Sequence, residues 1–279
     1  MFKNTVFNNK VIWITGASSG IGEALAFEFA RQGARLILSA RGVPALERVK
    51  AKCDLISEHN SNLVLPLDIT DELSMPAKVE QAKEWAGELD FLINNAGITQ
   101  RSSCLNTDVS TYRTIFEVDV FGQIALTKAV LPIMVDQGHG HFAVTSSVSG
   151  KVGVPFRTGY CAAKHAVMGF FDALRTEVDQ HNIKVTTITP GYVCTPISSN
   201  ALSGDGSDYN HQDSEIRSGM NVDDCAKAIV RGFRKGKPEI AVGKGIEMNA
   251  LWLKRYFPRI LFKMAAKQYD KMARNNNLY

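Results

Sequence analysis

The stretch Val11-Ile-Trp-Ile-Thr15-Gly16-Ala-Ser-Ser-Gly20-Ile-Gly22 decides the fold class. Its first four residues form a short apolar run, mostly β-branched, of the kind found in fully buried strands. The glycines that follow allow a sharp turn and a close approach of the backbone to a ligand, and residues 23–31 are typical of a helix whose N-terminus can bind phosphate. The stretch therefore predicts a strand–turn–helix unit of the dinucleotide-binding type. The glycine spacing alone is a weak signal.

The alternation of strands and helices continues along the chain and favours an α/β fold. It predicts a parallel sheet with helices on both faces, in a single doubly wound Rossmann domain that covers residues 1–245. Ligands of such folds bind beyond the carboxyl ends of the strands. Residues 246–279 are expected to form a basic amphipathic helical extension, in which Pro258 begins a second helix. Further strands are expected at 35–40, 62–67, 89–93, 141–145 and 183–189, and further helices at 44–57, 71–85, 108–136 and 158–180.

The composition is that of an ordinary soluble globular protein, with 45% hydrophobic and 22% charged residues. No apolar run is expected to approach the roughly 20 residues of a membrane-spanning helix. The five cysteines are scattered and form no Cys-x-x-Cys pair, which suits a reducing compartment and predicts a cytoplasmic protein. The histidines and carboxylates show no metal-ligand spacing, so no metal is expected.

The charge is unevenly distributed along the chain. From Lys227 onward the formal charge is +10, and the preceding part carries −6. Within the segment 248–267, Trp, Phe, Leu and Ile alternate with Lys and Arg. This pattern is typical of helices that lie in a membrane interface, and equally of a terminal helix pair that packs on its own domain or on a partner subunit. Peripheral membrane contact is therefore one of two open interpretations. No nucleic-acid recognition motif is present, so no nucleic-acid partner is expected.

A candidate catalytic pair lies in the helix expected at 158–180. Tyr160 and Lys164 are four residues apart and so share one helix face. A free phenol has a pKa of about 10, and a nearby cation is expected to lower this pKa towards the range useful for general acid–base catalysis. Ser147 follows the strand expected at 141–145, and its hydroxyl could hydrogen-bond the oxygen that Tyr160 protonates. Taken alone, Tyr-x-x-x-Lys is also typical of a solvated helix face.

Six motifs follow one another along residues 9–195. They are Thr15-Gly-x-x-x-Gly-Ile-Gly22, Leu67-Asp68-Ile69-Thr70, Asn94-Asn95-Ala96-Gly97, Ser147, Tyr160-x-x-x-Lys164 and Pro190-Gly191-x-x-x-Thr195. With these motifs in this order, the chain resembles the short-chain dehydrogenase/reductase family. The tail is similar to the C-terminal ends of membrane-associated hydroxysteroid and carbonyl reductases of that family.

The resemblance implies hydride transfer between a nicotinamide and a carbonyl or secondary alcohol carbon. Tyr160 would exchange the proton, Lys164 would lower its pKa and bind the nicotinamide ribose, and Ser147 would orient the substrate oxygen. Residues 192–222 would form a substrate lid, and the two long helices would join subunits in a homodimer or homotetramer. The expected cofactor-binding residues are Gly16, Ser18, Ser19, Gly20, Ile21, Arg41, Asp68, Ile69, Asn95, Ala96, Gly97, Tyr160, Lys164, Pro190, Gly191, Val193 and Thr195.

One departure from the family pattern concerns Asp119, which stands where the family usually has an Asn on the long helix. In the family the backbone carbonyl at this position holds a water that links the lysine to solvent, and Asp can substitute in that role. We therefore include Asp119 among the catalytic residues. An ionised Asp119 beside Lys164 would counter part of the effect of Lys164 on Tyr160. The alternative is a purely structural carboxylate.

The residues after the second expected strand bear on the cofactor. Family members that prefer NAD place an Asp there for the ribose 2′-hydroxyl, whereas this chain has Ser39-Ala40-Arg41. A guanidinium suits a 2′-phosphate, so NADP(H) is expected to be preferred over NAD(H). Many NADP-binding relatives carry a second basic residue in the glycine turn, where this chain has Ser19. The alternative for Arg41 is a solvated loop residue.

The leading hypothesis is an NADP(H)-dependent oxidoreductase that acts on a fairly apolar carbonyl compound or secondary alcohol. Two alternatives remain open. The first is an NADP(H)-binding regulator without turnover, which the intact Ser147, Tyr160 and Lys164 oppose and Asp119 allows. The second is a non-redox lyase or epimerase on the same fold.

Overall fold

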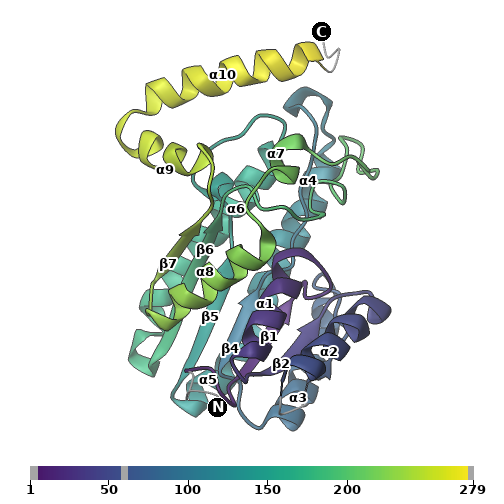
Figure 1. Ribbon diagram of the computed structural model, residues 1–279, viewed down its shortest axis with the longest axis vertical. Helices are drawn as coiled ribbons and strands as arrows, with labels where there is room; N and C mark the ends of the chain where they lie inside the picture. Colours follow the sequence, from purple (N-terminus) through teal and green to yellow (C-terminus); the bar gives the residue numbers. More distant parts are fainter. Residues whose placement is uncertain (1–5, 58–61, 276–279) are drawn as a thin grey trace.

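In the computed structural model, which describes residues 6–57 and 62–275, seven parallel strands form one sheet in the order β3-β2-β1-β4-β5-β6-β7 (Figure 1). The order reverses between β1 and β4, which creates a crevice at the carboxyl ends of these strands. The predicted doubly wound α/β fold is confirmed. The strands are β1 (Val11–Thr15), β2 (Arg35–Ser39), β3 (Leu63–Val64), β4 (Phe91–Asn94), β5 (Gly140–Thr145), β6 (Ile183–Pro190) and β7 (Glu239–Val242).

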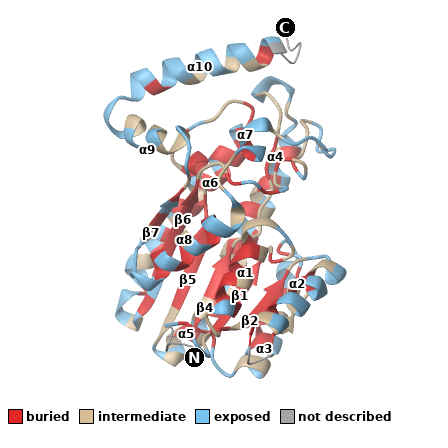
Figure 2. Ribbon diagram, viewed as in Figure 1, coloured by how far each residue is buried: buried red, intermediate tan, exposed pale blue. Residues whose placement is uncertain are grey.

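Alternate residues of β1 face opposite layers of helices, as the period of a strand requires. Ile12 and Ile14 pack into the apolar cluster that includes residues of α1 (Gly20–Arg31), α2 (Val43–Ile56) and α8 (Val222–Arg234). Val11 and Trp13 pack into a second cluster on the other face, formed with α3 (Met75–Ala86), α5 (Gly122–Gln137) and α6 (Thr158–Glu177). All five residues of β1 are buried, so the strand is the centre of the molecule (Figure 2).

The long helical region expected at 108–136 is divided. α4 (Val109–Phe116) passes through a π-helical turn, Glu117–Phe121, into α5. Within the described part of the chain, only Val109–Gln137 has the length and composition of a membrane-spanning helix, and its mean hydropathy is 1.6. The sequence shows no unbroken apolar run there because Gln123 and Lys128 interrupt it. In this fold the helix covers the sheet, with Leu126, Val130 and Met134 fully buried.

Two parts of the chain differ from the sequence-based expectations. The strand expected at 62–67 is only Leu63–Val64, and the helix expected at 71–85 begins with a 3₁₀ turn, Glu72–Ser74, before α3. Residues 222–242, for which no element was expected, form α8 and β7. Asn221 caps α8 by accepting hydrogen bonds from the backbone N–H groups of the two aspartates that follow. β7 adds an outer strand beside β6.

The C-terminal residues form α9 (Glu247–Tyr256) and α10 (Pro258–Asn275), which stand away from the sheet (Figure 1). Pro258 begins the second helix, as predicted. Leu261 packs into a small apolar cluster with Val148 and Val152, against which residues of α9 also lie. Tyr269 stacks on Phe156 at 5.1 Å between ring centroids. Most of α10 is exposed (Figure 2).

Candidate active site

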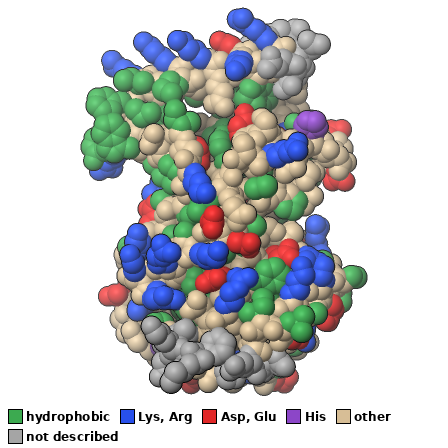
Figure 3. Space-filling view, in the orientation of Figure 1, with side chains coloured by type: hydrophobic (Ala, Val, Ile, Leu, Met, Phe, Trp, Pro, Cys, Tyr) green, Lys and Arg blue, Asp and Glu red, His purple; other side chains and the backbone are tan. Residues whose placement is uncertain are grey.

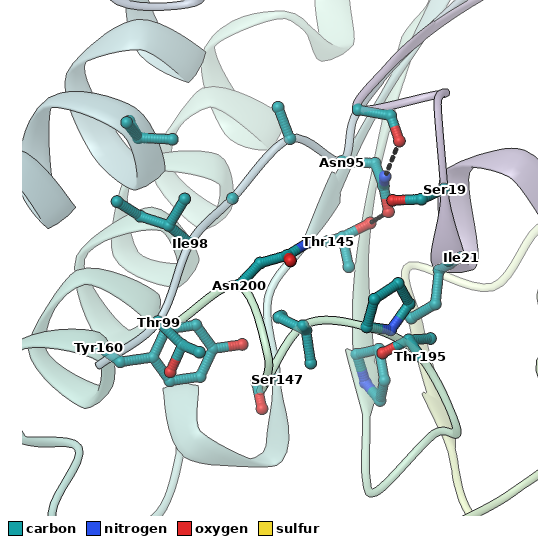
Figure 4. A pocket seen from close by; sticks show the side chains of 18 of the residues that line it. Ser19, Ile21, Asn95, Ile98, Thr99, Thr145, Ser147, Tyr160, Thr195 and Asn200 are labelled. Atoms are coloured by element: carbon teal, nitrogen blue, oxygen red, sulfur yellow. Dashed lines mark hydrogen bonds between the residues drawn. The ribbon is translucent and has the colours of Figure 1, made fainter. Parts of the chain in front are cut away.

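A cavity of about 840 Å³ lies at the carboxyl ends of the strands. Every residue expected to bind the cofactor lines this cavity, as do Ser147, Tyr160 and Lys164. Tyr160 and Ser147 lie at one end and Ser19, Ile21 and Thr195 at the other (Figure 4). Asp119 is fully buried and lies behind the cavity wall, because it is not among the residues that line the cavity. The sheet therefore brings the expected residues together, and their individual roles stay predictions.

The glycine turn after β1 is fixed by contacts that the motif did not reveal. Gly16 has a φ of +64°, and a Cβ there would lie 2.9 Å from Cα of Ala96, so only glycine fits. Oγ1 of Thr15 accepts the backbone N–H groups of Asn95 at 3.0 Å and Ala96 at 3.1 Å. Nδ2 of Asn95 donates to the carbonyl of Thr15. Thr15 and Asn95 thus hold the turn against the segment that follows β4.

The N-terminal end of α6 carries the catalytic pair. Oε1 of Gln100 accepts the backbone N–H of Tyr160 at 3.2 Å, which satisfies a donor that the first helical turn leaves open. Oγ of Ser147 accepts the N–H of Ser149 at 3.0 Å, so one lone pair of this hydroxyl is occupied. Gln100 lies in the loop after β4. No sequence motif contains it, so it was not predicted as a site residue.

Lys164 is held between two groups in the wall. Its Nζ donates to the carbonyl of Thr145 at 3.1 Å and lies 3.0 Å from Oδ2 of Asp119. Oδ1 of Asp119 accepts the backbone N–H of Ile98 at 2.7 Å. A Cβ at Gly97 would lie 3.1 Å from Nζ, so the missing side chain at Gly97 gives Lys164 room beside the cavity. The π-helical turn aims Asp119 at this point.

The pKa of Tyr160 differs from the value expected beside Lys164. Burial raises the pKa of Tyr160, Lys164 lowers it and Asp119 raises it again, with the sum above the usual value. The expectation that Lys164 lowers the pKa of Tyr160 on balance is therefore wrong in this structure, because burial outweighs the cation. Burial also raises the pKa of Asp119. Burial lowers the pKa of Lys164, but its ion pair and hydrogen bond with Asp119, together with the neighbouring Tyr160, raise it, and this pKa lies above its usual value.

The last residue of β2 and the residues just beyond it differ in exposure. Ser39 is fully buried, donates to the carbonyl of Leu65 and accepts from the indole of Trp13. Arg41 is exposed and lines the cavity. Hydrogen bonds from Thr70, and to a smaller degree the charge of Arg41, lower the pKa of Asp68. Arg41 is thus the basic side chain of this segment that faces the cavity.

The segment 192–222, expected as a lid, forms part of the cavity wall, and a bridge between Gln100 and Leu202 joins it to the loop after β4. A second bridge, between Val193 and Met220, joins the two ends of the segment. The short helix α7 (Ser214–Arg217) follows Asp213, to which Arg101 and Arg157 are ion-paired. Neither arginine was among the expected site residues, because no motif contains them.

The parallel sheet, the glycine turn and the Ser–Tyr–Lys group define a dinucleotide-dependent oxidoreductase. The profile of the short chain dehydrogenases matches residues 10–205. The chain belongs to the short-chain dehydrogenase/reductase family and is an oxidoreductase of that family.

Relatives and solved structures agree with this assignment. A dehydrogenase/reductase SDR family protein 7-like of Anopheles gambiae is 39% identical, over 95% of this chain and 84% of its own length. A dehydrogenase/reductase SDR family member 7B of Mus musculus is 36% identical, over 94% of this chain and 82% of its own length. A short-chain dehydrogenase/reductase from Burkholderia phymatum, in complex with NAD, superposes with a TM-score of 0.80 at 23% identity and covers 91% of this chain and 95% of its own. An alcohol dehydrogenase from Thermococcus sibiricus, complexed with 5-hydroxy-NADP, has a TM-score of 0.71 at 26% identity and covers 84% and 96%.

Proposed function

We propose that this protein is an NADP(H)-dependent oxidoreductase that interconverts a carbonyl and a secondary alcohol. The observation that carries the proposal is that one cavity joins the Ser147–Tyr160–Lys164 group to the glycine turn and Arg41. The solved relatives include one that is bound to NAD and one that is bound to an NADP derivative. The preference for NADP(H) therefore depends on Arg41, whose guanidinium suits a phosphate.

The residues present fit a dinucleotide. The turn at Gly16–Gly20 and the N-terminus of α1 would hold the diphosphate, Arg41 the 2′-phosphate, and Lys164 the nicotinamide ribose. The nicotinamide, when bound, supplies or takes up the hydride at the substrate carbon.

The chain itself handles the proton. In reduction, the hydroxyl of Tyr160 donates its proton to the carbonyl oxygen as that oxygen becomes an alcohol. Ser147 donates a hydrogen bond to the same oxygen and so orients it. The raised pKa of Tyr160 keeps the phenol protonated at neutral pH, which is the form that reduction needs. In oxidation the phenolate oxygen of Tyr160 accepts the proton from the alcohol of the substrate.

Arg41→Ala tests the cofactor preference. A charge-assisted contact to phosphate contributes about 1.5–3 kcal/mol, so we expect KM for NADPH to rise about 10- to 100-fold and KM for NADH to change little. The assay follows oxidation of both cofactors with a panel of ketones, aldehydes and dicarbonyl compounds. Arg31→Ala, at the far end of α1, is the control. Equal effects of Arg41→Ala on both cofactors would contradict the proposal.

The same assay separates the alternative functions. NADPH binding without turnover on the whole panel would favour a regulator. Conversion of a substrate without net consumption of NADPH would favour a lyase or an epimerase. Assembly into a homodimer or homotetramer through the long helices stays a prediction.

We infer in addition that the tail contacts an anionic membrane surface. Trp252, Tyr256 and Phe257 are exposed, and their rings cluster at the corner between α9 and α10. Figure 3 shows this apolar patch beside a row of basic side chains along α10. The basic residues of α10 are Arg259, Lys263, Lys267, Lys271 and Arg274. Exposed aromatic rings next to cations suit a lipid interface, where each cation contributes about 1 kcal/mol.

We expect the protein to pellet with phosphatidylserine vesicles and to do so far less with neutral ones. Combining Trp252→Glu with Phe257→Glu should leave it in the supernatant, because both side chains would become charged at the contact. Leu55→Glu is the matched control, since Leu55 is 88% exposed on α2. Vesicle binding that survives the double substitution would rule out this surface.

A further inference from the structure

Two buried arginines share one carboxylate at the substrate end of the cavity. Nε and Nη2 of Arg101 lie 2.7 and 2.6 Å from Oδ2 of Asp213, and Nη2 of Arg157 lies 2.9 Å from the same oxygen. The side chains of Arg101, Arg157 and Asp213 are only 7%, 10% and 12% exposed. Two cations facing one carboxylate leave a positive charge uncompensated in a place that water reaches poorly.

The two arginines are used differently. All three guanidinium nitrogens of Arg101 have partners, because Nη1 donates to Oγ1 of Thr99 and to the carbonyl of Gln100. In Arg157, only Nη2 donates to an acceptor within residues 6–57 and 62–275, and Nε and Nη1 have none. Neither nitrogen is among the fully buried polar atoms that lack a partner, and Arg157 lines the cavity, so a ligand there could accept hydrogen bonds from both. Arg101 positions the segment around Asp213, whereas Arg157, whose guanidinium lies 5.9 Å from the centre of the Tyr192 ring, keeps two nitrogens available to a ligand.

The open guanidinium is placed to meet a substrate. Arg157 lines the cavity and immediately precedes α6, three residues before Tyr160. Tyr160 lines the same cavity, so a ligand held by Arg157 would lie in the cavity that also holds the phenol. Three carboxylates line the cavity, those of Asp68, Asp208 and Glu247, and within the described residues none of them forms an ion pair with Arg157. Glu247 accepts the N–H groups of Tyr192 and Gly245, and Asp208 is exposed.

We propose that Arg157 binds an anionic group, a carboxylate or a phosphate, on the substrate. The inference rests on the proposed carbonyl chemistry and narrows its substrate class. A planar guanidinium with free N–H groups matches such oxyanions. The cavity wall also carries apolar side chains, which suit an amphiphilic acid with a charged end at Arg157 and an apolar body. The apolar wall residues are Ile98, Val118, Val148, Val154, Ile197 and Leu202.

The test measures binding, so that it does not depend on turnover. The protein is saturated with NADP⁺, which fills the glycine turn, and is titrated calorimetrically with octyl phosphate, octanoate and octanol. We expect one of the two anions to bind at least about tenfold more tightly than the alcohol, since a charge-assisted contact is worth that much. The better of the two anions identifies the head group.

Arg157→Gln should remove this discrimination, Arg157→Lys should keep part of it, and Arg217→Gln on the exposed face of α7 should keep all of it. Equal binding of anion and alcohol to the unaltered protein would overturn the proposal. So would an Arg157→Gln variant that binds all three compounds equally less well, because Arg157 would then only hold Asp213. Far-ultraviolet circular dichroism shows whether each variant is folded. Failure of NADP⁺ to bind would instead contradict the proposed function.

Discussion

Tyr160→Phe is expected to lower kcat about 10²- to 10⁴-fold, the usual contribution of a positioned general acid or base. The substitution removes the proton donor and leaves the ring, which is 8% exposed, in its packed position. The dissociation constant for NADPH should therefore stay the same within a few-fold. Stopped-flow measurement of cofactor oxidation, together with fluorescence titration of NADPH, separates the chemical step from binding.

Tyr112→Phe is the matched control, because its hydroxyl bonds to Thr158 at the start of α6 and does not line the cavity. It should keep kcat within a few-fold of the unaltered enzyme. A Tyr160→Phe enzyme with nearly full turnover would mean that another group transfers the proton.

Lys164→Met is expected to lower the free energy of unfolding by about 3–5 kcal/mol, besides abolishing turnover. The reason is that Asp119, which is fully buried, would lose the cation 3.0 Å away. A second substitution, Asp119→Asn, should restore most of this stability in the double variant but none of the activity. Urea unfolding of the unaltered protein, the single variant and the double variant gives the energies. Equal stability of the single and double variants would show that the carboxyl does not depend on Lys164.

The pH dependence of the Lys164→Met variant has a definite sign. Burial holds the pKa of Asp119 above its unfolded value, and removal of Lys164 takes away the charge that opposes this. The native state then binds a proton that the unfolded state releases, so the stability of the variant falls as the pH rises between the two pKa values. The loss should accordingly be smaller in acid than at neutral pH.

Much of the fold follows from local sequence. The buried runs that become β1, β2 and β5 and the glycine turn are short-range patterns, and the alternation of strands and helices fixes the layers. α8 and β7 were not foreseen because the family motifs end before them, although Asn221 and the spacing of apolar residues in α8 carry a helix signal. β3 is short because it pairs with β2 alone, and this pairing is not a local property of the sequence.

The candidate site also contains residues that sequence motifs identified and contacts that they did not predict. Motifs identified Ser147, Tyr160, Lys164 and the residues around the glycine turn, since each follows a strand or starts a helix. The ion pair of Asp119 with Lys164 and the net rise in the pKa of Tyr160 depend on burial, which a motif does not record. Arg101 and Arg157 both pair with Asp213, which lies more than fifty positions further along the chain. No local sequence pattern predicts such a contact.

The stacking of Tyr269 on Phe156 connects the tail to the substrate end of the site. Phe156 adopts a φ of +62°, a left-handed conformation that costs a non-glycine residue roughly 1–3 kcal/mol and persists only where its surroundings impose it. Its aromatic neighbour on α10 is part of those surroundings. The next residue in the chain is Arg157. The stacking contact therefore joins the tail to the residue that precedes Arg157, so α10 helps to hold the backbone from which that guanidinium extends.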